Sequence, residues 1–205
     1  MPRPLARATF SRSLFLVVSV VVTLGIAASA QAQNRVLLTP FTQALAEAAA
    51  SDDDIAAFYR SRDYQTLWTG TADEARRNAL LTALSRAGDH GLPVQRYDAA
   101  ALTAGFHAAR TEGDRGRLEV RMTRAFLDYA RDIQTGVLVP AKVDGGIVRE
   151  VPVRGRLANL RAFMAVEPAE FLNNLPPKNP AYAMLMKAKL RLEAQIAAEN
   201  RGGGW

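Results

Sequence analysis

The segment from Asp114 to Thr135 carries apolar residues three or four positions apart, which is the spacing that places side chains on one face of an α-helix. Gly136 follows this segment directly and can end the helix. Almost every other periodic segment of the chain also indicates a helix. The sequence therefore predicts an all-α fold without an internal repeat. The apolar stripe of the long helix consists of Leu118, Met122, Phe126, Tyr129 and Ile133.

Shorter helices are expected on both sides of the long one. One begins at Ser51-Asp52-Asp53-Asp54, with Ser51 as N-cap and the acids in the first turn. Another ends at Gly91-Leu92-Pro93, because Gly91 suits the left-handed position and proline prevents continuation. The last has Asn179 as its cap and Pro180 at the first helical position. Residues 137–153 are expected to form a loop that could hold a short hairpin. The last expected helix carries a stripe of Tyr182, Leu185, Ala188 or Lys189, Leu192 and Ile196. The expected helices cover residues 41–50, a segment that begins at 51, 73–89, 98–109, 114–135, 155–165, 168–174 and 179–200.

The first 32 residues have the pattern of a cleavable export signal. Three arginines precede an apolar run of fifteen residues, Leu14 to Ala28, and Ala30-Gln31-Ala32 fits the cleavage pattern. Cleavage after Ala32 would leave a mature protein that begins at Gln33 and lies in the periplasm. An uncleaved membrane anchor is the alternative, although a spanning helix needs roughly 20 apolar residues.

The predicted organisation is a signal peptide at 1–32, a tether at 33–40 and a single helical domain at 41–205. The whole chain has a formal net charge of +6, from 26 basic and 20 acidic residues. The signal holds three of the basic residues and none of the acids, so the mature chain has a balance of +3. Nucleic-acid binding needs basic residues clustered on one face. We therefore expect no nucleic-acid partner, and a membrane contact only if the signal is not cleaved.

The chain contains no cysteine, which excludes thiolate catalysis, cysteine-ligated zinc and disulfides. Its two histidines lie in different predicted elements. His90 sits in the helix-stop segment, where an imidazole can cap backbone carbonyls, and His107 is expected at the surface. No carboxylate at helical spacing joins the two histidines into a zinc site. No nucleophile motif accompanies them.

The remaining polar and aromatic clusters also favour structural roles. Asp52, Asp53 and Asp54 point in different directions around one helical turn, so they match a helix N-terminus better than a glycosidase pair or a calcium loop. The aromatic residues of the first segment could form a platform that stacks on sugars, but at helical spacing they favour the core. These aromatics are Phe58, Tyr59, Tyr64 and Trp68. No catalytic, cofactor-binding or metal-binding residue is predicted.

Five segments, in this order, resemble the N-terminal helical scaffold domain of large multi-domain murein L,D-transpeptidases. The resemblance covers about residues 44–205. The five segments are Ile55-x-x-Phe58-Tyr59 with Tyr64-x-x-Leu67-Trp68, Leu84-x-x-Ala87-x-x-His90-Gly91-Leu92 with Tyr97, Tyr129-Ala130-Arg131-Asp132-Ile133 with Gly136, Leu175-Pro176-Pro177 with Pro180, Tyr182 and Leu185, and Gly203-Gly204-Trp205.

The resemblance implies a fold and a pathway, but it gives this chain no catalytic residue. In that family the scaffold is followed by a peptidoglycan-binding domain and by a mostly β catalytic domain with a His and a Ser-x-Gly-Cys motif. No position of this chain matches that motif. The positions that the resemblance places in the core are Phe58, Trp68, Leu84, Leu92, Tyr129 and Tyr182.

The expected function is therefore the non-catalytic scaffold portion of an exported L,D-transpeptidase-like protein, either truncated or standing alone. Its expected partners are peptidoglycan or the wall-binding and catalytic domains that this chain does not contain. One alternative is a periplasmic binding module that docks on peptidoglycan or on a cell-wall-synthesis enzyme. A third hypothesis is an enzyme that uses carboxylates alone.

Overall fold

The computed structural model describes residues 39–146 and 154–202, which belong to one compact unit spanning residues 36–205. The predicted signal peptide, most of the tether, the apolar pair Ile147-Val148 and the closing Gly203-Gly204-Trp205 lie outside the described residues. Among the described residues, no helix is both long and apolar enough to cross a membrane.

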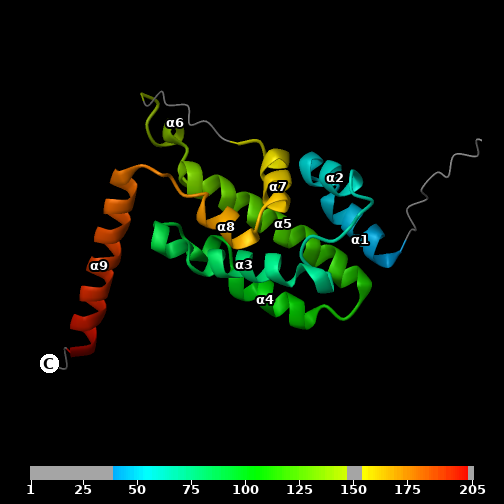
Figure 1. The fold of residues 1–205 in the computed structure, drawn as a ribbon, viewed down its shortest axis with the longest axis horizontal. Helices are drawn as coiled ribbons and strands as arrows, with labels where there is room; N and C mark the ends of the chain where they lie inside the picture. Colours follow the sequence, from blue (N-terminus) through cyan, green and yellow to red (C-terminus); the bar gives the residue numbers. More distant parts are fainter. Residues whose placement is uncertain (1–38, 147–153, 203–205) are drawn as a thin grey trace, which may run out of the picture. The chain divides into compact units, whose positions relative to one another are not determined.

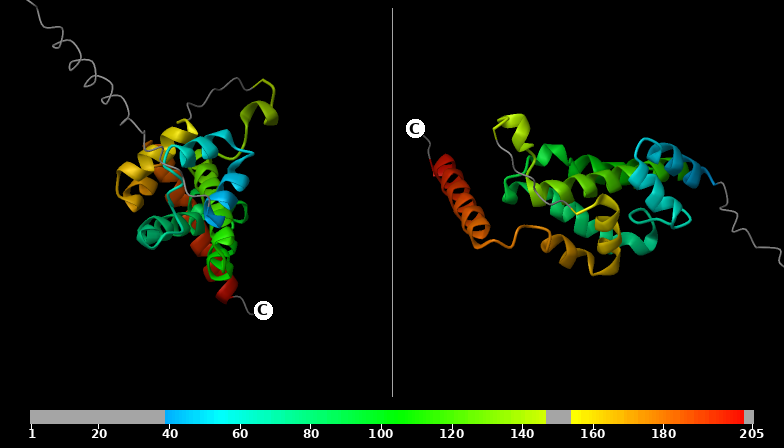
Figure 2. Two further views of the ribbon diagram at one scale, coloured as in Figure 1. Left: turned by 90° about the vertical axis from the view of Figure 1, so that its right-hand side faces the viewer. Right: turned by 90° about the horizontal axis from the view of Figure 1, so that it is seen from above.

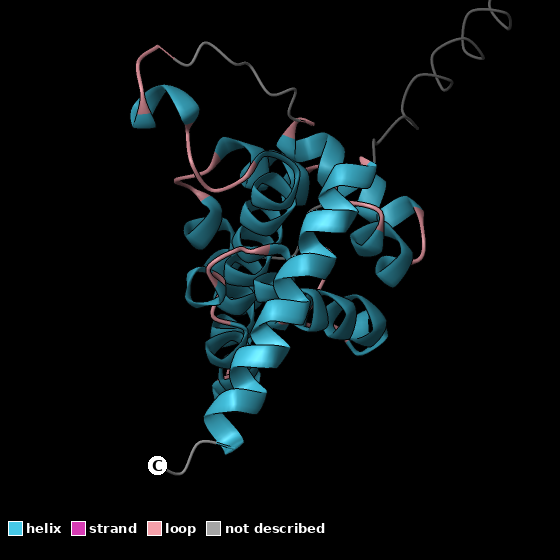
Figure 3. Cartoon of the chain, turned by 90° about the vertical axis from the view of Figure 1, so that its left-hand side faces the viewer, coloured by secondary structure: helices cyan, strands magenta, loops and turns pink. Residues whose placement is uncertain are grey.

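The predicted all-α class is confirmed, since the described residues form helices and connecting loops without a strand (Figure 3). Three of the elements are short 3₁₀ helices: η1 (Thr71–Asp73), η2 (Ala87–His90) and η3 (Val94–Arg96). The α-helices are α1 (Pro40–Ala49), α2 (Asp53–Arg60), α3 (Glu74–Ser85), α4 (Ala99–Ala108), α5 (Glu112–Thr135), α6 (Pro140–Val143), α7 (Arg156–Ala165), α8 (Pro168–Asn173) and α9 (Pro180–Gly202).

Several predicted boundaries differ from the structure, including the start of the long helix, which is Glu112 and not Asp114. The N-cap of α2 is Asp52 and not Ser51, because the Asp52 backbone is extended and its carboxylate accepts a hydrogen bond from the N–H of Ile55 at 3.2 Å. The helix expected over 73–89 changes from α3 to η2 after Ser85. The expected loop at 137–153 contains α6, where Pro140 occupies the first helical position.

Helix α5 lies among the other helices and supplies most of the side chains that they bury (Figure 1). Thr111 caps it, and a capping box joins Thr111 to Asp114. Helix α1 packs along the first half of α5 at very close range. A Cβ atom on Gly116 would lie only 2.5 Å from the Phe41 carbonyl oxygen, so glycine is needed for this approach.

An aromatic cluster joins α5 to α7, α8 and the segment after α2. The Trp68 ring centroid lies 5.8 Å from that of Phe126 and 5.3 Å from that of Phe163. Phe171 of α8 completes the cluster, with its centroid 5.5 Å from that of Phe163. Aromatic pairs at these separations add stabilisation beyond the area that they bury.

Five of the six predicted core residues are buried, namely Phe58, Trp68, Leu84, Leu92 and Tyr129. The sixth prediction is wrong, since Tyr182 is only half-buried. Tyr182 lies near the start of α9, which contacts the other helices chiefly through η2 (Figure 2). The predicted stripe of this helix is largely solvent-exposed at Leu185, Leu192 and Ile196, because no other described element covers it.

Trp68→Ala is expected to lower the free energy of unfolding by about 3–5 kcal/mol, the usual cost of truncating a large core aromatic. Trp68 is 0% exposed and donates its indole N–H to the Thr123 hydroxyl at 2.9 Å, so the substitution also removes a buried hydrogen bond. Urea unfolding measures the change. Trp205→Phe provides the background in which the emission of Trp68 is observed alone. A loss below about 1 kcal/mol, or emission typical of a tryptophan in water, would contradict the buried position.

Candidate functional site

The two histidines lie apart, and the described residues hold no cluster of histidines and carboxylates that could bind a metal ion. His107 is exposed on α4, where surface placement was expected. His90 does not cap a backbone carbonyl as predicted. Its Nδ1 atom instead lies 2.7 Å from the Tyr182 hydroxyl, and the two rings are nearly parallel, with an interplanar angle of 17°. His90 therefore connects η2 to the start of α9.

A groove with a volume of about 540 Å³ lies between α3 and α8. One wall is a single face of α3 with its C-cap residue Arg86, and its other members are Ala75, Asn78, Ala79, Thr82 and Ala83. The opposite wall comes from Glu167, Ala169, Leu172, Asn173 and Pro176. His90 and Tyr129 also line it. The lining thus combines alanines with amide, hydroxyl and charged groups, and this mixture suits a ligand with both polar and apolar parts.

The ionisable groups of this groove favour binding over catalysis. Burial lowers the pKa of His90, although neighbouring Asp89 opposes that shift. Burial likewise raises the pKa of Tyr129 to about 12. Glu167 is occupied as the N-cap of α8, where its carboxylate accepts from the N–H of Glu170 at 2.7 Å. Nucleophilic catalysis needs a nucleophile within hydrogen-bond reach of a base. The Tyr182 hydroxyl lies within reach of the His90 imidazole, but burial raises the pKa of Tyr182 and so disfavours the phenolate that would act as a nucleophile.

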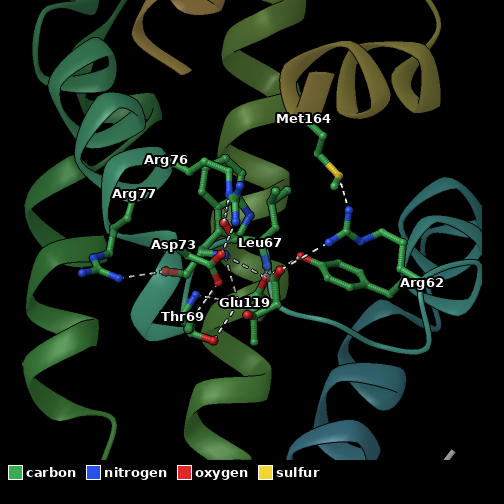
Figure 4. A network of polar contacts seen from close by, with 12 residues as sticks. Arg62, Leu67, Thr69, Asp73, Arg76, Arg77, Glu119 and Met164 are labelled. Atoms are coloured by element: carbon green, nitrogen blue, oxygen red, sulfur yellow. Dashed lines mark hydrogen bonds and ion pairs between the residues drawn. The ribbon is translucent and has the colours of Figure 1, made fainter. Parts of the chain in front are cut away.

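A dense polar network lies beneath the surface around Glu119 of α5 (Figure 4). Glu119 is 0% exposed, yet its two carboxylate oxygens accept hydrogen bonds from the backbone N–H groups of Leu67, Trp68 and Thr69. The hydroxyl groups of Tyr59 and Thr69 donate to the same carboxylate at 3.0 and 2.7 Å. Burial raises the pKa of Glu119, and these donors oppose part of that rise.

The carbonyl groups of the same three residues are paired as well. Arg76 of α3 donates to the Leu67 oxygen at 3.1 Å, and Arg77 donates to the Trp68 oxygen at 3.0 Å. Arg115 of α5 donates to the Thr69 oxygen at 3.1 Å. Side chains thus satisfy all six backbone groups of segment 67–69, which has no helical or sheet partner of its own. We call Glu119, the three arginines and segment 67–69 the Glu119 network.

A second buried carboxylate, Asp132, ties η3 to the later half of α5. The Tyr97 hydroxyl donates to Asp132 at 2.9 Å, and Arg96 and Arg131 form ion pairs with it at 2.8 and 2.6 Å. Burial and the bond to Asp132 raise the pKa of Tyr97. Glu119 and Asp132 are each surrounded by donors, as stable buried charges require. They hold helices together and do not line the groove between α3 and α8.

Sequence reasoning did not identify Glu119. The only available signal was its position: it precedes Met122 by three residues and Phe126 by seven, which places an acid on the apolar face of a helix. An acid at such a position requires buried donors, but the sequence does not indicate which segment provides them.

The model of the protein family described as Scaffold domain matches residues 53–188. This range contains α2 to α8, the start of α9 and the entire Glu119 network. No curated protein and no solved structure matches the chain. Because the match covers well over half of the sequence, the chain belongs to the Scaffold domain family.

Glu119→Gln is expected to lower the free energy of unfolding by about 1–3 kcal/mol, the cost of leaving a buried polar group unpaired. A carboxamide offers one acceptor oxygen, and its NH₂ group would face N–H donors that now bond to a carboxylate. Glu170→Gln is the control, because Glu170 is exposed on α8 and lies outside the Glu119 network. The control should change the free energy of unfolding by about 0.5 kcal/mol or less. Equal effects of the two substitutions in urea unfolding would contradict the role of the Glu119 network.

Proposed function

We propose that the chain is the non-catalytic scaffold portion of an exported L,D-transpeptidase-like protein that takes part in peptidoglycan cross-linking. Membership of the Scaffold domain family supports the scaffold part of this proposal. The link to L,D-transpeptidases rests on the resemblance of the five sequence segments. Export rests on residues 1–32, which lie outside the described residues.

The observation that carries the proposal is that residues of separate resembling segments contact one another in the structure. The ring of Tyr97 of the second segment packs edge-to-face on that of Tyr129 of the third, with their centroids 5.7 Å apart. His90 of the second segment contacts Tyr182 of the fourth, 92 positions later. Tyr97 likewise bonds to Asp132 of the third segment. The resemblance therefore lies in the residues that hold the helices together, which is the expected location for a shared scaffold.

The scaffold role follows from the chemistry of the family that the chain resembles. Cross-linking there begins when a cysteine thiolate attacks a peptide bond of a stem, which breaks that bond, releases the residue beyond it as a free amine and forms a thioester. An acceptor amine then attacks the thioester, forms the new amide bond and releases the thiol. This chain has no cysteine, so it cannot form that thioester. Its contribution would be to position the domains that do.

The purified chain is expected to produce no cross-linked product from peptidoglycan stem peptides, because it lacks the nucleophile. Cross-linking should appear when the chain is joined to an L,D-transpeptidase catalytic domain encoded downstream of its gene or beside it. The same catalytic domain joined to the Trp68→Ala variant is the control and should be less active. If neither position encodes a His and Ser-x-Gly-Cys domain, or if the scaffold makes no difference to the rate, the proposal is wrong.

The groove between α3 and α8 favours a second candidate, a periplasmic module that binds peptidoglycan itself. Its mixed lining suits a peptide stem, which presents amide groups and small apolar side chains together. Purified sacculi should then sediment with the chain. Thr82→Trp, which fills the groove, should reduce the bound fraction at least tenfold, about 1.4 kcal/mol. Ser85→Trp changes an exposed residue of the same helix outside the groove and should have no effect. Equal binding by both variants would exclude the groove as the binding site.

A further inference from the structure

Helix α9 exposes more large apolar side chains than any other described helix. Leu185, Leu192 and Ile196 are 72%, 59% and 56% exposed, whereas the stripe of α5 is buried. The helix reaches the other elements through its first turns, where Tyr182 meets His90. In Figures 1 and 2 the later turns of α9 extend beyond the other helices. An apolar stripe of this kind marks a surface that another molecule covers.

The spacing of the stripe is that of a coiled coil. The positions alternate by three and four residues, which is the heptad pattern of apolar a and d positions. Tyr182, Lys189 and Ile196 occupy the a positions, and Leu185, Leu192 and Glu199 occupy the d positions. The intervals predict knobs-into-holes packing against a second helix along this face.

We propose that α9 pairs with α9 of a second copy of this chain in an antiparallel coiled coil. This self-association goes beyond the scaffold function proposed above. In an antiparallel pair each a position faces a d position of the other helix. Ile196 then meets Leu185 of the other copy, and the stem of Lys189 meets Leu192. A twofold axis relates the two helices in this register, so each contact between an a position of one copy and a d position of the other occurs twice. The same face of α9 therefore forms both sides of the interface, as a twofold dimer requires.

The charges of α9 favour the antiparallel direction. Lys187, Lys189 and Arg191 give the first half of the helix a charge of +3, whereas Glu193, Glu199 and Arg201 give the second half a charge of −1. Antiparallel pairing brings the basic half of one helix beside the acids of the other. A parallel pair in register would place Lys189 against Lys189 and Glu199 against Glu199. Like charges in contact destabilise such an interface, whereas opposite charges favour it.

The interface would be small, because the apolar layers extend only from Leu185 to Ile196. Stable protein interfaces bury about 1,200–2,000 Å² in total, and weaker associations bury less. We therefore expect a reversible dimer. Sedimentation velocity at chain concentrations from about 1 to about 500 µM covers the dissociation constants expected of a small interface. The sample is the chain from Gln33 to Trp205, which contains the whole compact unit but not the apolar run near the N-terminus.

Three substitutions test the face and its pairing. Leu192→Lys places a second ammonium group opposite Lys189 of the other copy and should raise the dimer dissociation constant at least tenfold. Leu192→Glu places a carboxylate there and should weaken the dimer much less. Met184→Lys is the matched control, because Met184 is 66% exposed on α9 but lies outside the stripe, so it should leave the dimer intact. Circular dichroism checks that each variant keeps its helices.

The absence of cysteine allows a direct test of direction. Leu185→Cys and Ile196→Cys variants, mixed and oxidised, should form mainly the disulfide between the two different variants. A parallel pair would instead join each variant to itself. A chain that stays monomeric throughout the concentration range would overturn the proposal and leave the stripe to a different protein. The proposal would also be overturned if Leu192→Lys weakened the dimer no more than Met184→Lys does, or no more than Leu192→Glu does.

Discussion

The buried carboxylate of Glu119 is the interaction on which the arrangement of the other helices depends. It binds the three successive N–H groups of segment 67–69, and that segment connects α2 to η1 and α3. The chain reaches this position through a tight turn in which Asp63 and Tyr64 both adopt the left-handed conformation. Such backbone angles in non-glycine residues persist only where the surroundings fix them. Backbone hydrogen bonds from Tyr64 to Tyr59 and from Gln65 to Arg62 close this turn. Glu119 then holds the segment that follows it, so one side chain of α5 positions two neighbouring helices.

Apolar packing and polar pairing act together along α5. Trp68 stacks on Phe163, while its indole N–H bonds to Thr123, one turn from Glu119 on α5. The aromatic cluster is therefore oriented by the same residues that anchor segment 67–69. At the other end of the helix, Asp132 holds η3 by equivalent means. Both carboxylates cost free energy to bury, and their paired donors offset this cost. The result is a domain in which the specific positions of the helices follow from a few polar side chains, and cohesion follows from the apolar core.

The sequence predicted the parts of this structure that depend on local pattern. Helical spacing identified α5, since one apolar face suffices for that conclusion. The same spacing placed Trp68 in the core, where it lies, although its segment forms no helix. The pattern did not predict the partner of Glu119, because segment 67–69 lies about fifty residues earlier and has no period. The resemblance placed Tyr182 in the core, but Tyr182 is only half-buried, because α9 contacts the other helices chiefly through η2. The cap of α2 moved from Ser51 to Asp52 for a similar reason, since adjacent residues with suitable side chains compete for one position.

The pairing of segment 67–69 has a consequence for how the domain opens. Loops usually fluctuate independently of the helices that they connect, because water replaces their hydrogen bonds easily. Here the N–H groups bond to α5, and the carbonyl groups bond to arginines of α3 and α5. The loop cannot detach by itself, since its release exposes a buried carboxylate and separates two helices. A connection without regular secondary structure thus belongs to the same cooperative unit as the core, and its amide hydrogens are protected as long as that core stays closed.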